Sequence, residues 1–195
     1  FNNVRDGTSY VFTNCDKEGR LGPTQEDCDS EYLGTMLEGH VAVNEGIQQW
    51  IVPVSGNYTI NVQGAKGGDG SYAGSYTGGM GAKMQGQFAL EAGQILNILV
   101  GQKGTSSFEG GGGGGTYVVK ADDTPLIIAG GGGGAGGYGD GINGVIENSG
   151  TDGAAGGAGG SDGNGGSIVS TNGGSGAGFY TNGQGYSNSV SLSYL

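Results

Sequence analysis

The sequence has few of the residue types on which most protein chemistry depends. Its 195 residues include one histidine, two cysteines and three prolines, and only seven basic residues against eighteen acidic ones. Two cysteines and one histidine are too few for a usual closed zinc site. The formal net charge of -11 repels phosphate backbones and anionic lipid surfaces, which predicts that nucleic acid is not a partner.

Long apolar runs and a collagen-like repeat are also absent. The sequence contains no run of about twenty apolar residues, which a membrane-spanning helix needs, so no membrane insertion is predicted. Three prolines and the lack of a sustained Gly-X-Y period argue against a collagen triple helix. The opening residues FNNVRDG lack the basic and then apolar order of a signal peptide, which indicates a mature or excised segment.

The residue pattern contains no catalytic constellation. His40 is the only histidine, and a lone histidine beside a predicted strand is more often structural than a general base. No Gly-x-Ser-x-Gly elbow stands between a strand and a helix. A phosphate loop and a dinucleotide fingerprint are both missing. We therefore predict that the protein is not an enzyme and uses no cofactor.

Glycine is the residue that the sequence has in excess, with 50 copies. Disorder is one interpretation, because Gly/Ser-rich segments usually behave as flexible linkers. Against it, short apolar runs at 117–119 and 126–128 stand between glycine runs. In extended polyproline-II-like segments, N–H and C=O groups point outward, and only glycine allows such backbones to approach closely on every side. The sequence therefore predicts a packed bundle of such segments.

Apart from glycine, the chain predicts β-strands with at most one short helix. Apolar and polar residues alternate from Tyr58 to Val62, which places one face of the strand on a core. Residues 25–33 predict the helix, with Thr24 as its N-cap. The predicted strands are 9–13, 40–43, 47–54, 58–62, 84–90, 94–100, 116–120, 126–129, 167–170 and 186–194. This pattern is typical of an all-β antiparallel sandwich.

The predicted organisation is a single composite domain over residues 1–195. Its β-sandwich core comprises about 1–63, 84–100, 116–129 and 186–195, and glycine-rich insertions occupy about 64–83 and 108–185. If the last strand closes the same sheet as strand 9–13, both insertions are held at each end. An insertion that is held in this way can be ordered.

The two cysteines, Cys15 and Cys28, enclose a short loop rich in turn residues. This spacing permits a disulfide, and two free thiols are the alternative. Disulfides persist in oxidising, extracellular environments.

Three stretches occur in order: YVFTNCDKEGRLGPTQEDC, GIQQWIVPVSGNYTINVQGAKGG and GGGGGGTYVVKADDTPLIIAGGGGG. Together they closely resemble the glycine-rich extracellular region of the anaplastic lymphoma kinase and leukocyte tyrosine kinase receptors, over roughly residues 1–139. The resemblance implies a tumour-necrosis-factor-like jelly-roll sandwich that carries a bundle of polyglycine-II helices. It also implies that Cys15 and Cys28 are bonded, and that the region binds small protein cytokines in those receptors.

A few residues are candidates for binding or modification. Asp140, Asp152 and Asp162 lie in glycine-rich turns, where their carboxylate oxygens are candidate ligands for a calcium ion. The alternative interpretation is that these aspartates are solvated turn residues that bind no metal. Asn57 begins the sequon Asn-Tyr-Thr, which is either glycosylated or bare. Trp50 is interpreted as a core residue rather than a carbohydrate platform, because apolar residues adjoin it.

We compare three hypotheses for the function with these patterns. The first is a non-enzymatic, secreted or cell-surface structural module that self-assembles into a filament, matrix or surface layer, with Val190, Leu192 and Tyr194 as assembly residues on the last strand. The second is a ligand-binding ectodomain, either cytokine-receptor-like or an adhesin, with an extracellular protein or glycan as its partner. The third, an enzyme, lacks a supporting constellation. Tyrosines beside glycine, at 72, 76, 138, 180 and 186, are predicted to make surface contacts.

Overall fold

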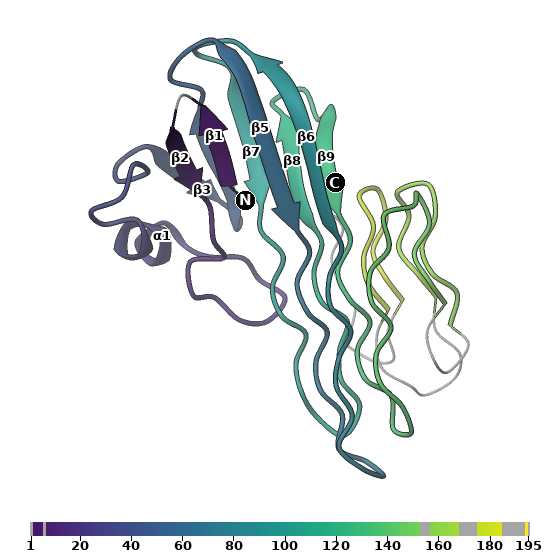
Figure 1. Cartoon of the computed structure of the whole chain (residues 1–195). Coiled ribbons are helices and arrows are strands. Elements are labelled where there is room, and N and C mark those ends of the chain that lie inside the picture. Colours follow the sequence, from purple (N-terminus) through teal and green to yellow (C-terminus); the bar gives the residue numbers. More distant parts are fainter. Residues whose placement is uncertain (1, 6, 153–156, 168–174, 185–193, 195) are drawn as a thin grey trace.

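The computed structural model describes residues 2–5, 7–152, 157–167, 175–184 and 194. Two antiparallel sheets and one short helix make up the regular structure of these residues (Figure 1). The four-stranded sheet has the order β2-β1-β5-β6, and the five-stranded sheet has the order β3-β4-β7-β8-β9. The elements are β1 (Asn2–Arg5), β2 (Thr8–Val11), α1 (Gln25–Glu31), β3 (Val41–Asn44), β4 (Ile47–Ile51), β5 (Gly56–Gln63), β6 (Lys83–Leu90), β7 (Ile95–Leu99), β8 (Thr116–Lys120) and β9 (Pro125–Ala129). The predicted β class with one short helix is confirmed.

The main hydrophobic core contains side chains from both sheets. Trp50 of β4 lies at its centre with 1% of its surface exposed. The rings of Tyr10, Phe12 and Tyr58 surround the indole at centroid distances of 4.9, 5.8 and 6.2 Å. Edge-to-face and tilted contacts of this kind are favourable for aromatic rings. The prediction that Trp50 is a core residue is confirmed.

Strand β5 shows the alternation that its sequence predicts. Tyr58, Ile60 and Val62 are buried, whereas the residues between them are exposed or half-buried. Because side chains of a strand alternate between its two faces, β5 presents one face to the core. Its partner β6 runs antiparallel beside it, with Tyr58 opposite Phe88.

Helix α1 begins at a capping box. The Asp27 backbone N–H donates to the Thr24 hydroxyl, and the Thr24 N–H donates to the Asp27 carboxylate at 2.7 Å. The helix ends at Glu31, two residues before its predicted end. Tyr32 is the C-cap, and Gly34 follows in the left-handed region at φ +74°. A helix usually stops where the backbone enters that region.

The helix is tied to the sheets through a covalent bond and a buried polar group. Cys15 and Cys28 form a disulfide with a Cα–Cα distance of 5.0 Å. Gln48 of β4 is fully buried, donates to the Thr13 carbonyl at 2.7 Å and accepts from the Tyr32 hydroxyl at 2.5 Å. Both links fix α1 against the end of β2.

The bounds of the described strands agree with the prediction to within two residues, with two exceptions. β1 was not predicted, although the dipeptide Asp6-Gly7 is a hairpin signal; Gly7 has φ +82° between β1 and β2. β4 ends at Ile51 rather than at Val54, shortly before Pro53, which has no N–H to donate to a ladder. The predicted strands 167–170 and 186–194 lie outside the described residues, except for Ser167 and Tyr194.

Glycine-rich segments continue from the ends of β5, β7 and β9 and run side by side away from the sheets (Figure 1). Their backbone hydrogen bonds repeat every three residues, with successive groups directed to different neighbours. In segment 64–70, the N–H groups of Gly64, Gly67 and Gly70 donate to one neighbouring segment, at the carbonyls of Ala82, Gly79 and Tyr76 respectively. The N–H groups of Ala65 and Gly68 donate to another, at the carbonyls of Gly114 and Gly111. We call the segments of residues 64–82, 100–115 and 130–144 the glycine bundle.

The glycine bundle is too tightly packed for side chains at many positions. A Cβ added to Gly64 would overlap the carbonyl oxygen of Gly130, and one on Gly67 would overlap that of Gly133. A Cβ on Gly130 itself would meet nothing within 4 Å. Glycine is therefore required at particular positions by the approach of a neighbouring backbone, and the prediction of close backbone packing is confirmed for these residues.

Two further glycine-rich segments, 157–167 and 175–184, lie alongside the glycine bundle, beyond the end of β9 (Figure 1). Phe179 of the second of these segments stacks on Tyr117 of β8 at a centroid distance of 6.0 Å. Val119 completes the buried part of this smaller cluster, which forms apart from the main core. Within the described ranges, no helix is long and apolar enough to cross a bilayer.

Candidate functional site

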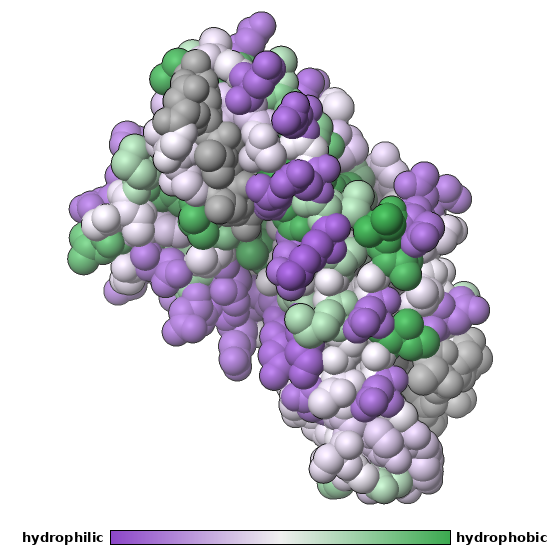
Figure 2. Space-filling model, viewed as in Figure 1, coloured by the Kyte–Doolittle hydropathy of each residue, from purple (hydrophilic) through white to green (hydrophobic). Residues whose placement is uncertain are grey.

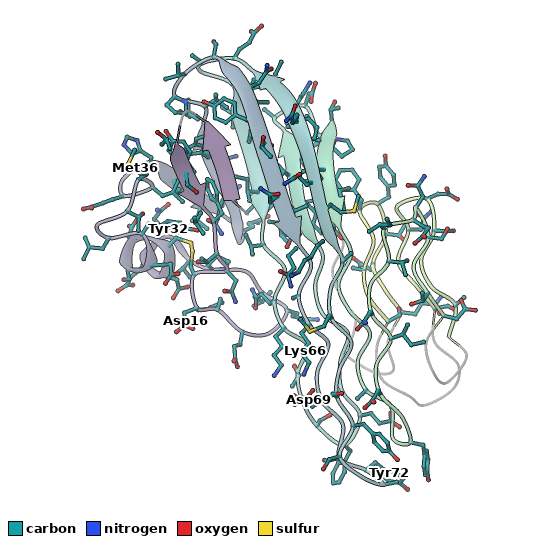
Figure 3. All side chains as sticks on the ribbon, viewed as in Figure 1. Asp16, Tyr32, Met36, Lys66, Asp69 and Tyr72 are labelled. Atoms are coloured by element: carbon teal, nitrogen blue, oxygen red, sulfur yellow. A yellow bond between two sulfur atoms is a disulfide. The ribbon has the colours of Figure 1, made fainter. Side chains whose placement is uncertain are left out.

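Three turns of the glycine bundle meet at the end furthest from the sheets. Each carries an exposed aromatic residue: Tyr72 is 60% exposed, Phe108 is 73% exposed and Tyr138 is 78% exposed. Figure 3 shows Tyr72 at this end, with Asp69 and Lys66 successively closer to the sheets. We call Tyr72, Phe108 and Tyr138 the aromatic tip.

Backbone hydrogen bonds hold the three turns together. The N–H groups of Ser71 and Tyr72 both donate to the carbonyl of Phe108 at 3.2 Å. The N–H of Ala73 donates to the carbonyl of Gly137, also at 3.2 Å. Because these bonds join three separate turns, they fix the relative positions of the backbone atoms that carry the aromatic side chains.

The two tyrosine rings of the tip are in contact. Tyr72 and Tyr138 have ring centroids 5.7 Å apart and an interplanar angle of 76°. A Cβ added to Gly137 would lie 3.3 Å from the Tyr72 ring and 3.4 Å from a carboxylate oxygen of Glu109. Aromatic surface and a hydrogen-bond acceptor are therefore close neighbours at the tip.

A small charged cluster supports the bundle behind the tip. One oxygen of Asp69 accepts from the Lys66 ammonium at 2.6 Å and from the Gly78 N–H at 2.9 Å, and Lys103 approaches the other oxygen at 3.8 Å. The hydrogen bond from Lys66, with that from Gly78, lowers the pKa of Asp69. The Asp69 N–H also donates to the Ser106 hydroxyl at 3.0 Å. These contacts cross-connect segments that lead into different turns.

The surface of the bundle is intermediate in hydropathy rather than strongly apolar. In Figure 2 the end of the molecule that carries the bundle is mostly pale, whereas strongly hydrophilic residues gather nearer the middle. Exposed aromatic residues on a rigid support bury much area at little cost in side-chain entropy when a partner binds. The tip offers aromatic surface of this kind on three hydrogen-bonded turns.

The three candidate calcium ligands do not meet. An oxygen of Asp140 accepts from the Thr77 N–H at 2.8 Å, and one of Asp152 accepts from the Gly159 N–H at 3.0 Å. Asp162 occupies a turn with φ +51°. No group of three or more His, Cys, Asp or Glu residues is arranged to hold a metal ion in the part of the chain that the structure describes. Asp140 and Asp152 thus bond to backbone at separate turns.

The other predicted residues lie in different parts of the molecule. Asn57 is exposed near the start of β5, opposite Ala89. Tyr194 stacks on Phe179 at 5.0 Å and lies 5.6 Å from Tyr117, and its burial raises the pKa of its hydroxyl. Val190 and Leu192 lie outside the described residues. His40 is exposed immediately before β3.

The sequence pattern identified only part of the aromatic tip. Tyr72 and Tyr138 were among the tyrosines predicted to make surface contacts, and both are exposed. Phe108 was missed. The signal that would have indicated it is its place in SSFEG, where an apolar residue stands in a polar turn directly before a glycine run.

Comparison with known proteins supports the resemblance noted in the sequence. Over 104 residues the chain is 36% identical to leukocyte tyrosine kinase receptor of Mus musculus, and the aligned part is 52% of this chain. The chain covers only 12% of that receptor's length. No protein-family model matches the chain. The predicted similarity to this receptor is confirmed.

Proposed function

We propose that this chain is a non-enzymatic extracellular recognition module, in which the two sheets anchor a rigid glycine bundle that presents the aromatic tip to a partner. The observation that carries the proposal is that three hydrogen-bonded turns each present an exposed aromatic residue, Tyr72, Phe108 and Tyr138. The similarity to a receptor supports a role in binding. The disulfide between Cys15 and Cys28 fits an oxidising, extracellular compartment.

The glycine bundle, in this proposal, consists of polyglycine-II helices. The support is the period of three in its hydrogen bonds, because such helices have three residues per turn and no internal hydrogen bonds. A tumour-necrosis-factor-like jelly roll is our proposal for the sheets, and two antiparallel sheets around a shared core support it. The insertions at 64–83 and 108–185 would then elaborate one composite domain.

The proposed partner is an extracellular protein or a glycan. Aromatic rings supply most of the energy at many protein interfaces and also stack on the faces of sugars. Rigidity favours either partner, because a surface that is already ordered loses less entropy on binding. Glu109 adds a hydrogen-bond acceptor beside the rings.

The test compares binding by the whole chain to arrays of extracellular protein domains and of glycans. The test variant combines Tyr72→Ala, Phe108→Ala and Tyr138→Ala, and the control is Tyr180→Ala, an exposed tyrosine outside the tip. We expect the triple variant to lose affinity by about 30-fold or more, as loss of a binding hot spot does, and the control to bind like the wild type. Equal binding by all three proteins, or no binder on either array, would reject the proposal.

Self-assembly into a filament, matrix or surface layer is a second candidate. Its support is that β2 and β6 are the outer strands of the described four-stranded sheet, and β3 and β9 those of the five-stranded sheet. An outer strand offers N–H and C=O groups to a strand of another copy. Sedimentation and negative-stain electron microscopy test this idea. Filaments that disappear in Val190→Asp/Leu192→Asp would support it, and monomers at high concentration would oppose it.

A further inference from the structure

The contact between Tyr72 and Tyr138 has a chemical consequence that is independent of any partner. Their rings lie 5.7 Å apart at centroids, and both side chains are more than half exposed. The residues are far apart in sequence, but backbone bonds between their turns, such as Ala73 N–H to the Gly137 carbonyl, hold them together. Exposed side chains change rotamer rapidly, so the rings can reorient until carbon atoms of both meet.

We propose that Tyr72 and Tyr138 form an oxidative cross-linking site that yields dityrosine within one chain. The oxidant is hydrogen peroxide acting through a haem peroxidase. Each phenol loses one electron and one proton, and the two phenoxyl radicals join through a carbon–carbon bond between ring positions adjacent to the oxygens. Loss of the ring hydrogens as protons, which return to the phenolate oxygens, restores both aromatic rings. Peroxide accepts the two electrons and two protons and becomes two water molecules.

Three other tyrosines with aromatic neighbours, Tyr117, Tyr180 and Tyr194, are less suited to this reaction. Tyr117 and Tyr194 are at a similar separation, 5.6 Å, but Tyr117 is only 7% exposed. Tyr180 is exposed, but its ring packs edge-on against Phe179 at 4.9 Å. The pair at the tip combines access to an oxidant with a nearby second phenol. Proximity of this kind raises the effective concentration of the second group far above that of another molecule.

The cross-link would join two of the three turns that form the tip. Besides the contact of the rings, the hydrogen bond from the Ala73 N–H to the Gly137 carbonyl joins residues 71–75 to residues 136–140. A covalent bond between them would restrict opening of the bundle end, because it limits the conformations of the opened state. Slower backbone amide exchange in both turns is the expected sign of this restriction.

The experiment treats the purified chain, at low concentration, with hydrogen peroxide and a haem peroxidase. We expect a monomer lighter by two hydrogen atoms. After proteolysis, a linked species should contain Tyr72 in one peptide and Tyr138 in the other. Cleavage after Lys66 and Lys83 gives a peptide that contains Tyr76 as well as Tyr72. The variants Tyr72→Phe and Tyr138→Phe therefore assign the link to particular residues. Each should abolish it and keep the ring packing.

The variant Tyr180→Phe serves as the matched control and should cross-link as the wild type does. Unfolding in urea before oxidation should remove the intramolecular product, because the two tyrosines are then no longer held together. A covalent dimer as the main product, an unchanged mass, or a link that persists in Tyr72→Phe would overturn the proposal. None of these outcomes depends on whether the tip binds a protein or a glycan.

Discussion

The sheets and the glycine bundle bury their chains by opposite means. Between the sheets, large side chains fill the space around Trp50, and the strand ladders pair backbone groups within each sheet. In the bundle, backbones approach so closely that an added Cβ at Gly64 would overlap the carbonyl oxygen of Gly130. There the order comes from a network of backbone hydrogen bonds with a period of three.

This difference explains how one chain carries 50 glycines and an ordered structure together. Glycine loses more backbone entropy on ordering than any other residue. Hydrogen bonds and close contacts between backbones offset that loss where several segments pack side by side. The sheets supply the anchor, because they fix the ends of the segments that leave β5, β7 and β9.

The largest expected effect is in the side-chain core. Trp50→Ala should lower the free energy of unfolding by about 3–5 kcal/mol, since it removes a buried indole and leaves a cavity. The control is Ile51→Ala at the next residue, which is 59% exposed and should cost much less. Denaturant unfolding of both variants measures the difference. Similar losses in the two variants would contradict a core centred on Trp50.

The next effect tests the backbone packing of the bundle. Gly64→Ala should lower the free energy of unfolding by about 1–3 kcal/mol, because one added methyl group overlaps a carbonyl oxygen that must then move. The control is Gly130→Ala, at the other residue of this contact. Its added methyl group meets nothing within 4 Å, so it should change the stability by less than about 0.5 kcal/mol. Hydrogen exchange in residues 64–82 locates the effect. Equal costs in the pair would mean that the backbones are not closely packed there.

A smaller effect should come from a side chain that bonds to backbone. Thr24→Ala removes the hydroxyl that accepts from the Asp27 N–H at the start of α1 and should cost about 1 kcal/mol. The exposed Thr151 provides the control Thr151→Ala, for which no loss is expected. Thermal unfolding of the two variants compares them. An unchanged midpoint for Thr24→Ala would show that the cap contributes nothing.

The smallest expected effect is the acid dependence of each region. Hydrogen bonds from Thr24 and then Lys17 lower the pKa of Asp27 from 3.8 to about 2. A carboxylate whose pKa is lowered in the folded state stabilises the fold above its unfolded pKa, and this contribution is lost as the pH falls through the folded pKa. Asp27→Asn should therefore flatten the decline in stability between about pH 4 and pH 2.

Asp69→Asn is the corresponding test in the bundle, where the Lys66 ammonium lowers the pKa of Asp69. It should also flatten the acid dependence, and hydrogen exchange should show the change in the bundle rather than near α1. If either variant keeps the wild-type acid dependence, the lowered pKa of that aspartate does not contribute to stability.

Local patterns were sufficient for most of the sheet structure. The alternation in β5 and the capping residues of α1 were read correctly, because both depend on neighbours within a few positions. The end of α1 was predicted two residues too far along, since Leu33 continues an apolar pattern past the C-cap Tyr32. β1 was missed because its four residues have little apolar character, and its pairing with β5 comes from a distant part of the chain.

The aromatic tip was less predictable than the sheets. Tyr72 and Tyr138 were recognised only as tyrosines beside glycine, and Phe108 was not recognised at all. Their meeting depends on how far each glycine segment extends from the sheets and on which segments are neighbours. Neither quantity is encoded within one segment, because the hydrogen bonds that set it join segments up to tens of residues apart.

The sequence by itself determined the β class, the single short helix and the need for close backbone packing, because periodicity, capping and glycine content act locally. Only the tertiary structure decided which glycines permit no side chain and which do, as Gly64 and Gly130 show. It also decided that the three turns with exposed aromatic residues are joined by backbone hydrogen bonds. The physical reason is that both outcomes depend on distances between segments, and these are set when the segments pack.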